Sequence, residues 1–158
     1  MRKGSQALLA VALVLTLGGA ADTMQMNPGR WEVVLKGVSG TVAGEPMADA
    51  TIAAGNKTKF ACVSPAEARG PEAYFKRSGM TGGGECSAPT GSAKGGRVTL
   101  AATCSKADMS AQLALAGTYG ANVFHMDADA KMTAAAGPLT MKVAIDGRYV
   151  GPCKGDEE

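Results

Sequence analysis

The only histidine of the sequence lies in a row with two carboxylates. His125, Asp127 and Asp129 occupy alternate positions, so a β-strand would place all three side chains on one face. Such a row has donor atoms for a weakly held divalent metal. Stable zinc-type sites use further nitrogen or sulfur ligands, and the sequence has no second histidine. We therefore interpret the row as a solvated strand face and predict no bound metal and no cofactor.

Two carboxylates are enough for one kind of catalysis, the hydrolysis of a glycosidic bond. On one strand face, Asp127 and Asp129 would lie about 7 Å apart. A Ser-His-Asp triad lacks its nucleophile, because no G-x-S-x-G stretch is present. We predict no catalytic residues and keep a hydrolase that uses Asp127 and Asp129 as the alternative. A deep cleft around His125 and the aspartates would favour that hydrolase, whereas a flat solvated face would favour a protein without catalysis.

The four cysteines, Cys62, Cys86, Cys104 and Cys153, contain no C-x-x-C pair, so a zinc or thioredoxin-like site is not indicated. Their even number predicts two disulfides formed in an oxidising compartment. Cys86 and Cys104 bracket a segment whose midpoint is Gly95. A symmetric hairpin there would place these two cysteines opposite each other and leave Cys62 to pair with Cys153. The competing arrangement joins Cys62 to Cys86 across a helix, and Cys104 to Cys153.

Nine methionines raise the question of copper(I), which prefers soft thioether ligands. Met109, Met126 and Met141 fall on the apolar sides of predicted strands, where methionine fills gaps in a core. Met24 and Met26 form the only adjacent pair that we expect to be exposed. We interpret the methionines as packing residues.

The N-terminus has the pattern of a secretory signal peptide. Arg2 and Lys3 precede an apolar stretch over residues 7–17, and small residues follow at positions 18–21. The apolar stretch is shorter than the roughly 20 residues that span a bilayer. We predict a cleavable signal peptide over residues 1–21.

Cleavage after Ala20 or Ala21 would leave residues 22–158 as a single disulfide-stabilised β domain without a stable membrane anchor. Without Arg2 and Lys3, fourteen basic and fourteen acidic residues remain. A net charge of zero, with no basic stripe, excludes a typical nucleic-acid-binding protein. We interpret the acidic tail over residues 156–158 as a solvated chain end.

Period-two alternation of apolar and polar residues dominates this part of the chain and predicts strands that are packed on one face. The predicted strands cover residues 30–36, 57–62, 97–104, 108–115, 124–131 and 139–146. In the second of these, Thr58, Phe60 and Cys62 oppose Lys57, Lys59 and Ala61. Short connections favour an antiparallel meander, which forms either a curved sheet or a small barrel.

One helix is predicted near residues 64–75. Ser64, Pro65 and Glu67 have the types of an N-cap, a first-turn proline and the acidic partner of a capping box. The sequence is therefore mostly β with one short helix. The segment over residues 40–55 is rich in small residues, and its pattern predicts neither order nor disorder.

Several short motifs resemble a known bacterial envelope family, domain of unknown function 3617. They are the stretch Met26-Asn27-Pro28-Gly29-Arg30-Trp31-Glu32-Val33, the sequence Cys62-Val63-Ser64-Pro65, the middle cysteines Cys86 and Cys104, and the closing Gly147-Arg148-Tyr149-Val150-Gly151-Pro152-Cys153. The resemblance implies a periplasmic location in a Gram-negative bacterium. The family has no assigned activity, so it implies no catalytic residue. This chain departs from it mainly over residues 40–55.

The sequence thus predicts a location and an architecture more sharply than an activity. We expect a non-enzymatic module of the bacterial envelope, exported to the periplasm, that binds a small apolar ligand or a protein partner through one face of its sheet. The hydrolase based on Asp127 and Asp129 is the alternative from a different class.

Overall fold

The computed structural model describes residues 24–79, 85–106, 109–135 and 137–157. The predicted signal peptide over residues 1–21 and its cleavage site lie outside this range.

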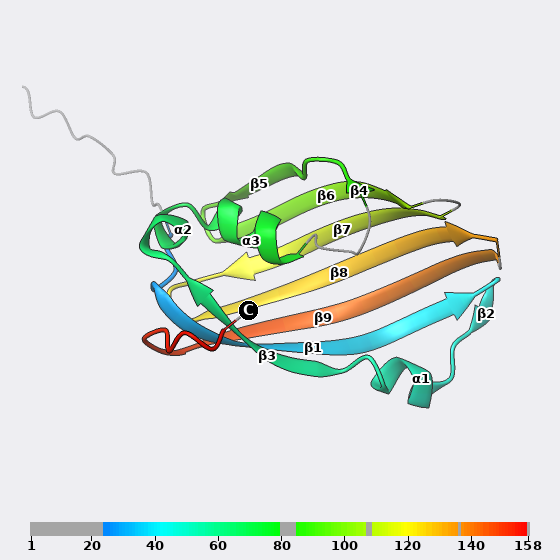
Figure 1. The fold of residues 1–158 in the computed structure, drawn as a ribbon, viewed down its shortest axis with the longest axis horizontal. Coiled ribbons are helices and arrows are strands. Elements are labelled where there is room, and N and C mark those ends of the chain that lie inside the picture. The colour runs from blue at the N-terminus through cyan, green and yellow to red at the C-terminus, as the bar shows by residue number, and fades with distance from the viewer. Residues whose placement is uncertain (1–23, 80–84, 107–108, 136, 158) are drawn as a thin grey trace, which may run out of the picture.

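A single antiparallel sheet organises the described chain (Figure 1). Its strands are β1 (Gly29–Val42), β2 (Glu45–Pro46), β3 (Lys57–Val63), β4 (Glu85–Cys86), β5 (Thr90–Lys94), β6 (Arg97–Lys106), β7 (Met109–Tyr119), β8 (Val123–Ala134) and β9 (Gly137–Gly151). Their order is β2-β1-β9-β8-β7-β6-β4, while β3 pairs with one half of β1 and β5 with one half of β6. The predicted antiparallel β architecture is confirmed, and of the two alternatives the sheet is curved and open rather than a closed barrel.

Three short helices accompany the sheet in the described ranges: α1 (Asp49–Ala53), α2 (Pro65–Arg69) and α3 (Pro71–Gly79). The predicted helix start is correct, since Ser64 and Glu67 form a reciprocal capping box. The helix predicted near residues 64–75 is present as two helices, because the segment breaks into α2 and α3. Pro71 disfavours a helical conformation at the residue before it, and Gly70 leaves the helix at φ −129°. Helix α1 lies within the segment over residues 40–55, for which the sequence made no prediction.

Helices α2 and α3 lie over one end of one face of the sheet, which we call the inner face (Figure 1). The core between them contains Trp31, Val33, Val98, Leu100, Leu115, Phe124 and Met126 from the strands, with Ala68, Tyr74 and Phe75 from the helices. Phe124 is the centre of an aromatic cluster, and its ring centroid lies 5.5 Å from that of Trp31 and 5.4 Å from that of Phe75. The rings lock the helices to this end of the sheet.

In β3, the residues that face the core are not the ones that the composition of the strand suggests. Ala61 and Val63 are buried, whereas Phe60 is 36% exposed on the opposite face. The register explains this, because Ala61 pairs with Trp31 of β1 and therefore shares its face. Phe60 is covered partly by Arg30, whose guanidinium carbon lies 4.0 Å from the ring centroid.

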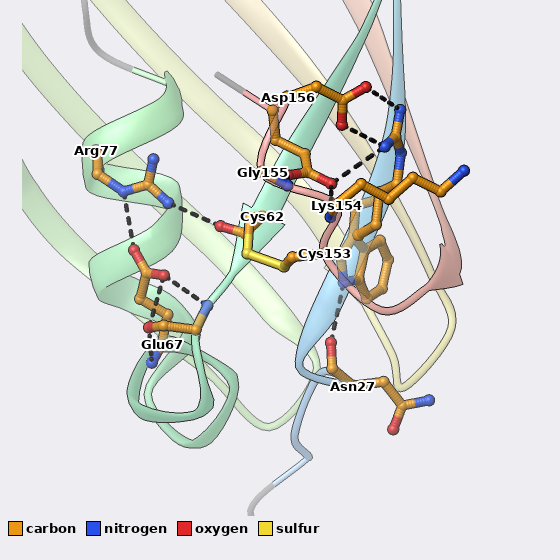
Figure 2. Close-up of a disulfide and its surroundings, with 12 residues drawn as sticks. Asn27, Cys62, Glu67, Arg77, Cys153, Lys154, Gly155 and Asp156 are labelled. Carbon is orange, nitrogen blue, oxygen red and sulfur yellow. Dashed lines mark hydrogen bonds and ion pairs between the residues drawn. A yellow bond between two sulfur atoms is a disulfide. The ribbon is translucent and has the colours of Figure 1, made fainter.

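The acidic tail is folded against the sheet, so its interpretation as a solvated end was wrong. The guanidinium of Arg30 is buried and pairs with the carboxylates of Asp156 and Glu157 (Figure 2). The Glu157 carboxylate also accepts hydrogen bonds from the backbone N–H groups of Lys154 and Gly155, at 2.7 and 2.8 Å. These contacts hold the residues that follow β9 against the start of β1.

Two disulfides join the four cysteines as Cys62–Cys153 and Cys86–Cys104. The first ties the end of β3 to the segment after β9 (Figure 2), with 5.6 Å between the Cα atoms. The second links β4 to β6, where the two cysteines are direct register partners. This is the pairing expected from the hairpin centred on Gly95, and the arrangement through Cys62 and Cys86 does not occur.

No helix within the described ranges is long and apolar enough to cross a membrane. The two disulfides fit a chain that folds in an oxidising compartment.

Candidate functional site

The predicted row of His125, Asp127 and Asp129 lies on the outer face of β8, away from the helices. Two of its members, His125 and Asp129, pair with side chains of β9. His125 Nδ1 lies 2.6 Å from Asp146 Oδ1, and the hydrogen bond that the imidazole forms with this carboxylate raises the pKa of His125. Asp129 faces Lys142 at 3.7 Å. All four of these side chains are about half exposed, so the row has the geometry of a solvated, charge-paired face.

Two members of this row, His125 and Asp129, line separate open hollows. In the part of the chain that the structure describes, no group of three or more histidine, cysteine or acidic side chains could hold a metal ion. One open hollow of about 600 Å³ is lined by His125 and Asp146, together with the Glu32–Arg148 ion pair. Another, of about 390 Å³, is lined by Asp129. Asp127 lines neither of them, so the two carboxylates do not share a hollow.

The inner face offers a different kind of surface in the half that α2 and α3 leave open. Strand β9 has 15 residues and so spans about 50 Å, whereas α3 has nine and spans about 14 Å. Beyond α2 and α3, the strands β7, β8 and β9 therefore continue without a described helix over them (Figure 1). We define the open inner half as Ala111, Leu113, Ala128, Ala130, Met132, Leu139, Met141 and Val143, all of them half-buried.

Strand register places these side chains next to one another across the sheet. Val143 pairs with Ala128, Met141 with Ala130, and Leu139 with Met132. Strand β7 adds Leu113 opposite Ala130 and Ala111 opposite Met132. The result is a continuous apolar surface in which small alanines alternate with long, flexible side chains.

The segment between β2 and β3 borders the open inner half along β1. Gly37 and Gly40 of β1 lack side chains, and Ile52 of α1 and Met47 pack directly against these positions. A side chain at either glycine would collide with them, so the glycines admit this close approach. One flank of the open surface is therefore walled by apolar residues.

A small cavity of about 50 Å³ marks the boundary between the helix-covered core and the open inner half. Its lining includes Leu35, Leu115 and Ile145 from the sheet, and Tyr74 and Phe75 from α3. Burial raises the pKa of the Tyr74 hydroxyl to about 12, so this wall carries no negative charge at neutral pH. We call this cavity, which is mostly apolar but is also lined by Lys59 and Ser78, the apolar neck.

The methionines divide between core and open surface. Met126 is buried and Met141 half-buried, but Met109 is 47% exposed at the far end of β7. The expectation of an exposed Met24–Met26 pair was wrong, because Met26 is only 2% exposed and belongs to the core. Its backbone N–H donates to the carbonyl of Ala68 in α2, which anchors this segment under the helices.

The open inner half was not expected from the sequence as an uncovered surface. Its apolar positions in β7, β8 and β9 were correctly placed on one face but were assumed to be covered. The missing signal was length, because a single helix over residues 64–75 is too short to cover strands this long.

Comparison with known proteins adds a family and nothing more specific. No curated protein and no solved structure matches the chain significantly. A family described as protein of unknown function (DUF3617) matches residues 26–153, which includes every strand, both disulfides and the open inner half. The chain belongs to this family.

Proposed function

We propose that this protein is a non-enzymatic module that binds a small apolar ligand on the open inner half. The observation behind the proposal is that the eight neighbouring apolar side chains of the open inner half are only half-buried, next to a core whose members are fully buried. A contiguous exposed apolar surface on a folded protein is typical of a binding site.

The surroundings favour a small ligand over a protein partner. The segment with Met47 and Ile52 borders one side of the surface, and α3 with its apolar neck closes one end. A surface bordered on one flank and at one end suits a small molecule better than a broad protein interface, which needs an accessible area of roughly 800 Å² on each partner. The methionines allow the surface to adapt to different apolar shapes.

We further propose that the protein is exported and works in the periplasm. The support is the signal-like sequence over residues 1–21 and the two disulfides. N-terminal sequencing of the protein recovered from the periplasm should begin at Ala21 or Asp22. A retained Arg2 would contradict cleavage.

Binding can be tested with a neutral apolar dye, N-phenyl-1-naphthylamine, whose fluorescence rises in an apolar site. We expect Ala130→Gln to weaken dye binding several-fold, because it places an amide in the middle of the open inner half. Ala114→Gln is the matched control, since Ala114 is an exposed alanine on the outer face of β7. Equal binding by the two variants, or no dye binding by the unmodified protein, would contradict the proposal. Capture of another protein with no small-molecule binding would assign the surface to a partner instead.

The aspartates of the outer face provide a second control. Asp127→Asn and Asp129→Asn should leave dye binding unchanged and shift the melting temperature by no more than a degree or two, since surface substitutions of this kind change stability by about 0.5 kcal/mol or less. A large loss of stability in either variant would show a structural role. Hydrolysis of a glycoside that both variants abolish would establish the alternative, a hydrolase.

A further inference from the structure

We infer that the ligand is an amphiphile with a single hydrocarbon chain and an anionic head group, which it places beside Lys59 and Lys57 of β3. This inference rests on the proposed function, because it assigns the chemistry of the ligand for the same open inner half. Three features support it: the sign of the inner-face charges, their position, and the length of the apolar surface.

The long strands place their carboxylates on the outer face of the sheet. The acidic residues of β1, β8 and β9, which are Glu32, Asp127, Asp129 and Asp146, all lie on that face. On the inner face, the charged residues of β1, β3 and β6 to β9 are Lys57, Lys59 and Lys106. Glu45 of β2 is the exception, because it pairs with Val42 and so shares the inner face with Leu139, at the end of the open inner half away from the β3 lysines. A head group beside Lys57 and Lys59 therefore meets two lysine side chains and no strand carboxylate, which favours an anionic group.

Lys57 and Lys59 stand at the end of the open inner half that adjoins the core. Lys59 pairs with Val33 and Lys57 with Leu35, which puts both side chains on the inner face of the β3 edge. Lys59 is half-buried and lines the apolar neck together with Ser78 and Phe75. With the head group at this position, the hydrocarbon chain of the ligand would extend along the open inner half, away from the helices.

The apolar surface ahead of these lysines fits an extended hydrocarbon chain. From Leu115 to Met109, strand β7 advances by six residue steps, or about 20 Å. Alanines at positions 111, 128 and 130 form a low floor, and Leu113 and Met141 rise beside it. Lys106 lies on the inner face at the opposite end, on the far edge of the sheet, and provides the comparison that identifies which end takes the head group.

The experiment compares three C14 compounds that differ only in the head group: tetradecanoate, tetradecanol and tetradecyltrimethylammonium. Each displaces N-phenyl-1-naphthylamine from the full mature protein, below its critical micelle concentration and at low salt. We expect tetradecanoate to bind about tenfold more tightly than tetradecanol, and the cation more weakly than either. Lys57→Met/Lys59→Met should abolish the preference for the anion, so that tetradecanoate and tetradecanol displace the dye from this variant at similar concentrations. Lys106→Met should keep the preference.

The outcomes separate this inference from the proposed function. Equal binding of the three compounds would overturn the inference but leave an apolar site in place. The same holds if the preference for the anion survives Lys57→Met/Lys59→Met, or if it is lost in Lys106→Met. Failure of all three to displace the dye, or no dye binding, overturns the proposed function as well. If the double variant does not fold, Lys59→Arg should keep the preference and Lys59→Gln should reduce it. Vesicles of phosphatidylglycerol identify the source of the anion: displacement by vesicles but not by tetradecanoate overturns the assignment to a single-chain amphiphile.

Discussion

The two disulfides should contribute unequally to stability, and the difference follows from the lengths of chain that they enclose. Cys62–Cys153 separates its cysteines by 91 residues, and Cys86–Cys104 by 18. In the chain-entropy model, closing these loops removes unfolded-state entropy worth about 4.6 and about 3.2 kcal/mol at 25 °C. The longer loop should therefore stabilise the protein by about 1.4 kcal/mol more.

The local structure around each disulfide should increase this difference in stability. Cys86 and Cys104 face each other as register partners of β4 and β6, and β6 also pairs with β5 and β7. These strand pairs hold β6 in place without the bridge. Cys153 lies beyond the end of β9, where the described tail contacts the fold mainly through Arg30. Loss of the Cys62–Cys153 bridge therefore also loosens the tail.

The assay is urea unfolding of two double variants, Cys62→Ala/Cys153→Ala and Cys86→Ala/Cys104→Ala, which leave no free thiol from the broken bridge. We expect the first to lose at least about 1.4 kcal/mol more unfolding free energy than the second. The m-value of both should rise, because an unfolded chain with fewer cross-links exposes more surface. An equal loss, or a larger loss in the Cys86→Ala/Cys104→Ala variant, would refute the argument from loop length.

Two further predictions concern the aromatic cluster and the outer face. Phe124→Leu should lower the free energy of unfolding by about 2 to 4 kcal/mol, since it removes ring contacts worth about 0.5 to 1.5 kcal/mol each. Phe60→Leu should lower it by less than about 1 kcal/mol, because Phe60 is partly exposed. Thermal unfolding compares the two variants, and similar losses of stability would contradict the assigned core. The raised pKa of His125 means that its pairing with Asp146 stabilises the fold below the unfolded-state value of about 6.5 and ceases to do so as pH rises through the folded value. Asp146→Asn should remove that pH-dependent difference and lower the imidazole pKa in an NMR titration, and an unchanged titration would show that the pair does not form in solution.

Local chemistry made much of the fold predictable. The alternation of apolar and polar residues predicted the long strands, because one face of an antiparallel sheet packs against the core and the other is exposed to solvent. Ser64 and Glu67 marked the start of α2 because a capping box is contained within four residues. The break at Gly70 and Pro71 was equally local, and the restriction that proline places on its predecessor would have located it.

Features that depend on distant partners were not predictable in the same way. Arg30 is buried because carboxylates 126 and 127 residues away fold back onto it. Phe60 faces outward because the register with β1 places its neighbour Ala61 beside Trp31. The candidate site has this long-range character too, because its exposure depends on where α3 ends relative to strands far along the chain.

The position of β9 has a consequence for the order in which the protein can fold. This strand comes last among the described strands, yet it lies between β1 and β8 and hydrogen-bonds with both along most of its length. Whether a ribosome or a translocation pore delivers the chain, residues 29–42 emerge early and must wait for residues 137–151. Until then β1 and β8 are exposed edges, and exposed edges promote aggregation. Closure of the sheet is therefore a late, non-local and slow step, during which the chain would profit from a chaperone that shields unpaired strands.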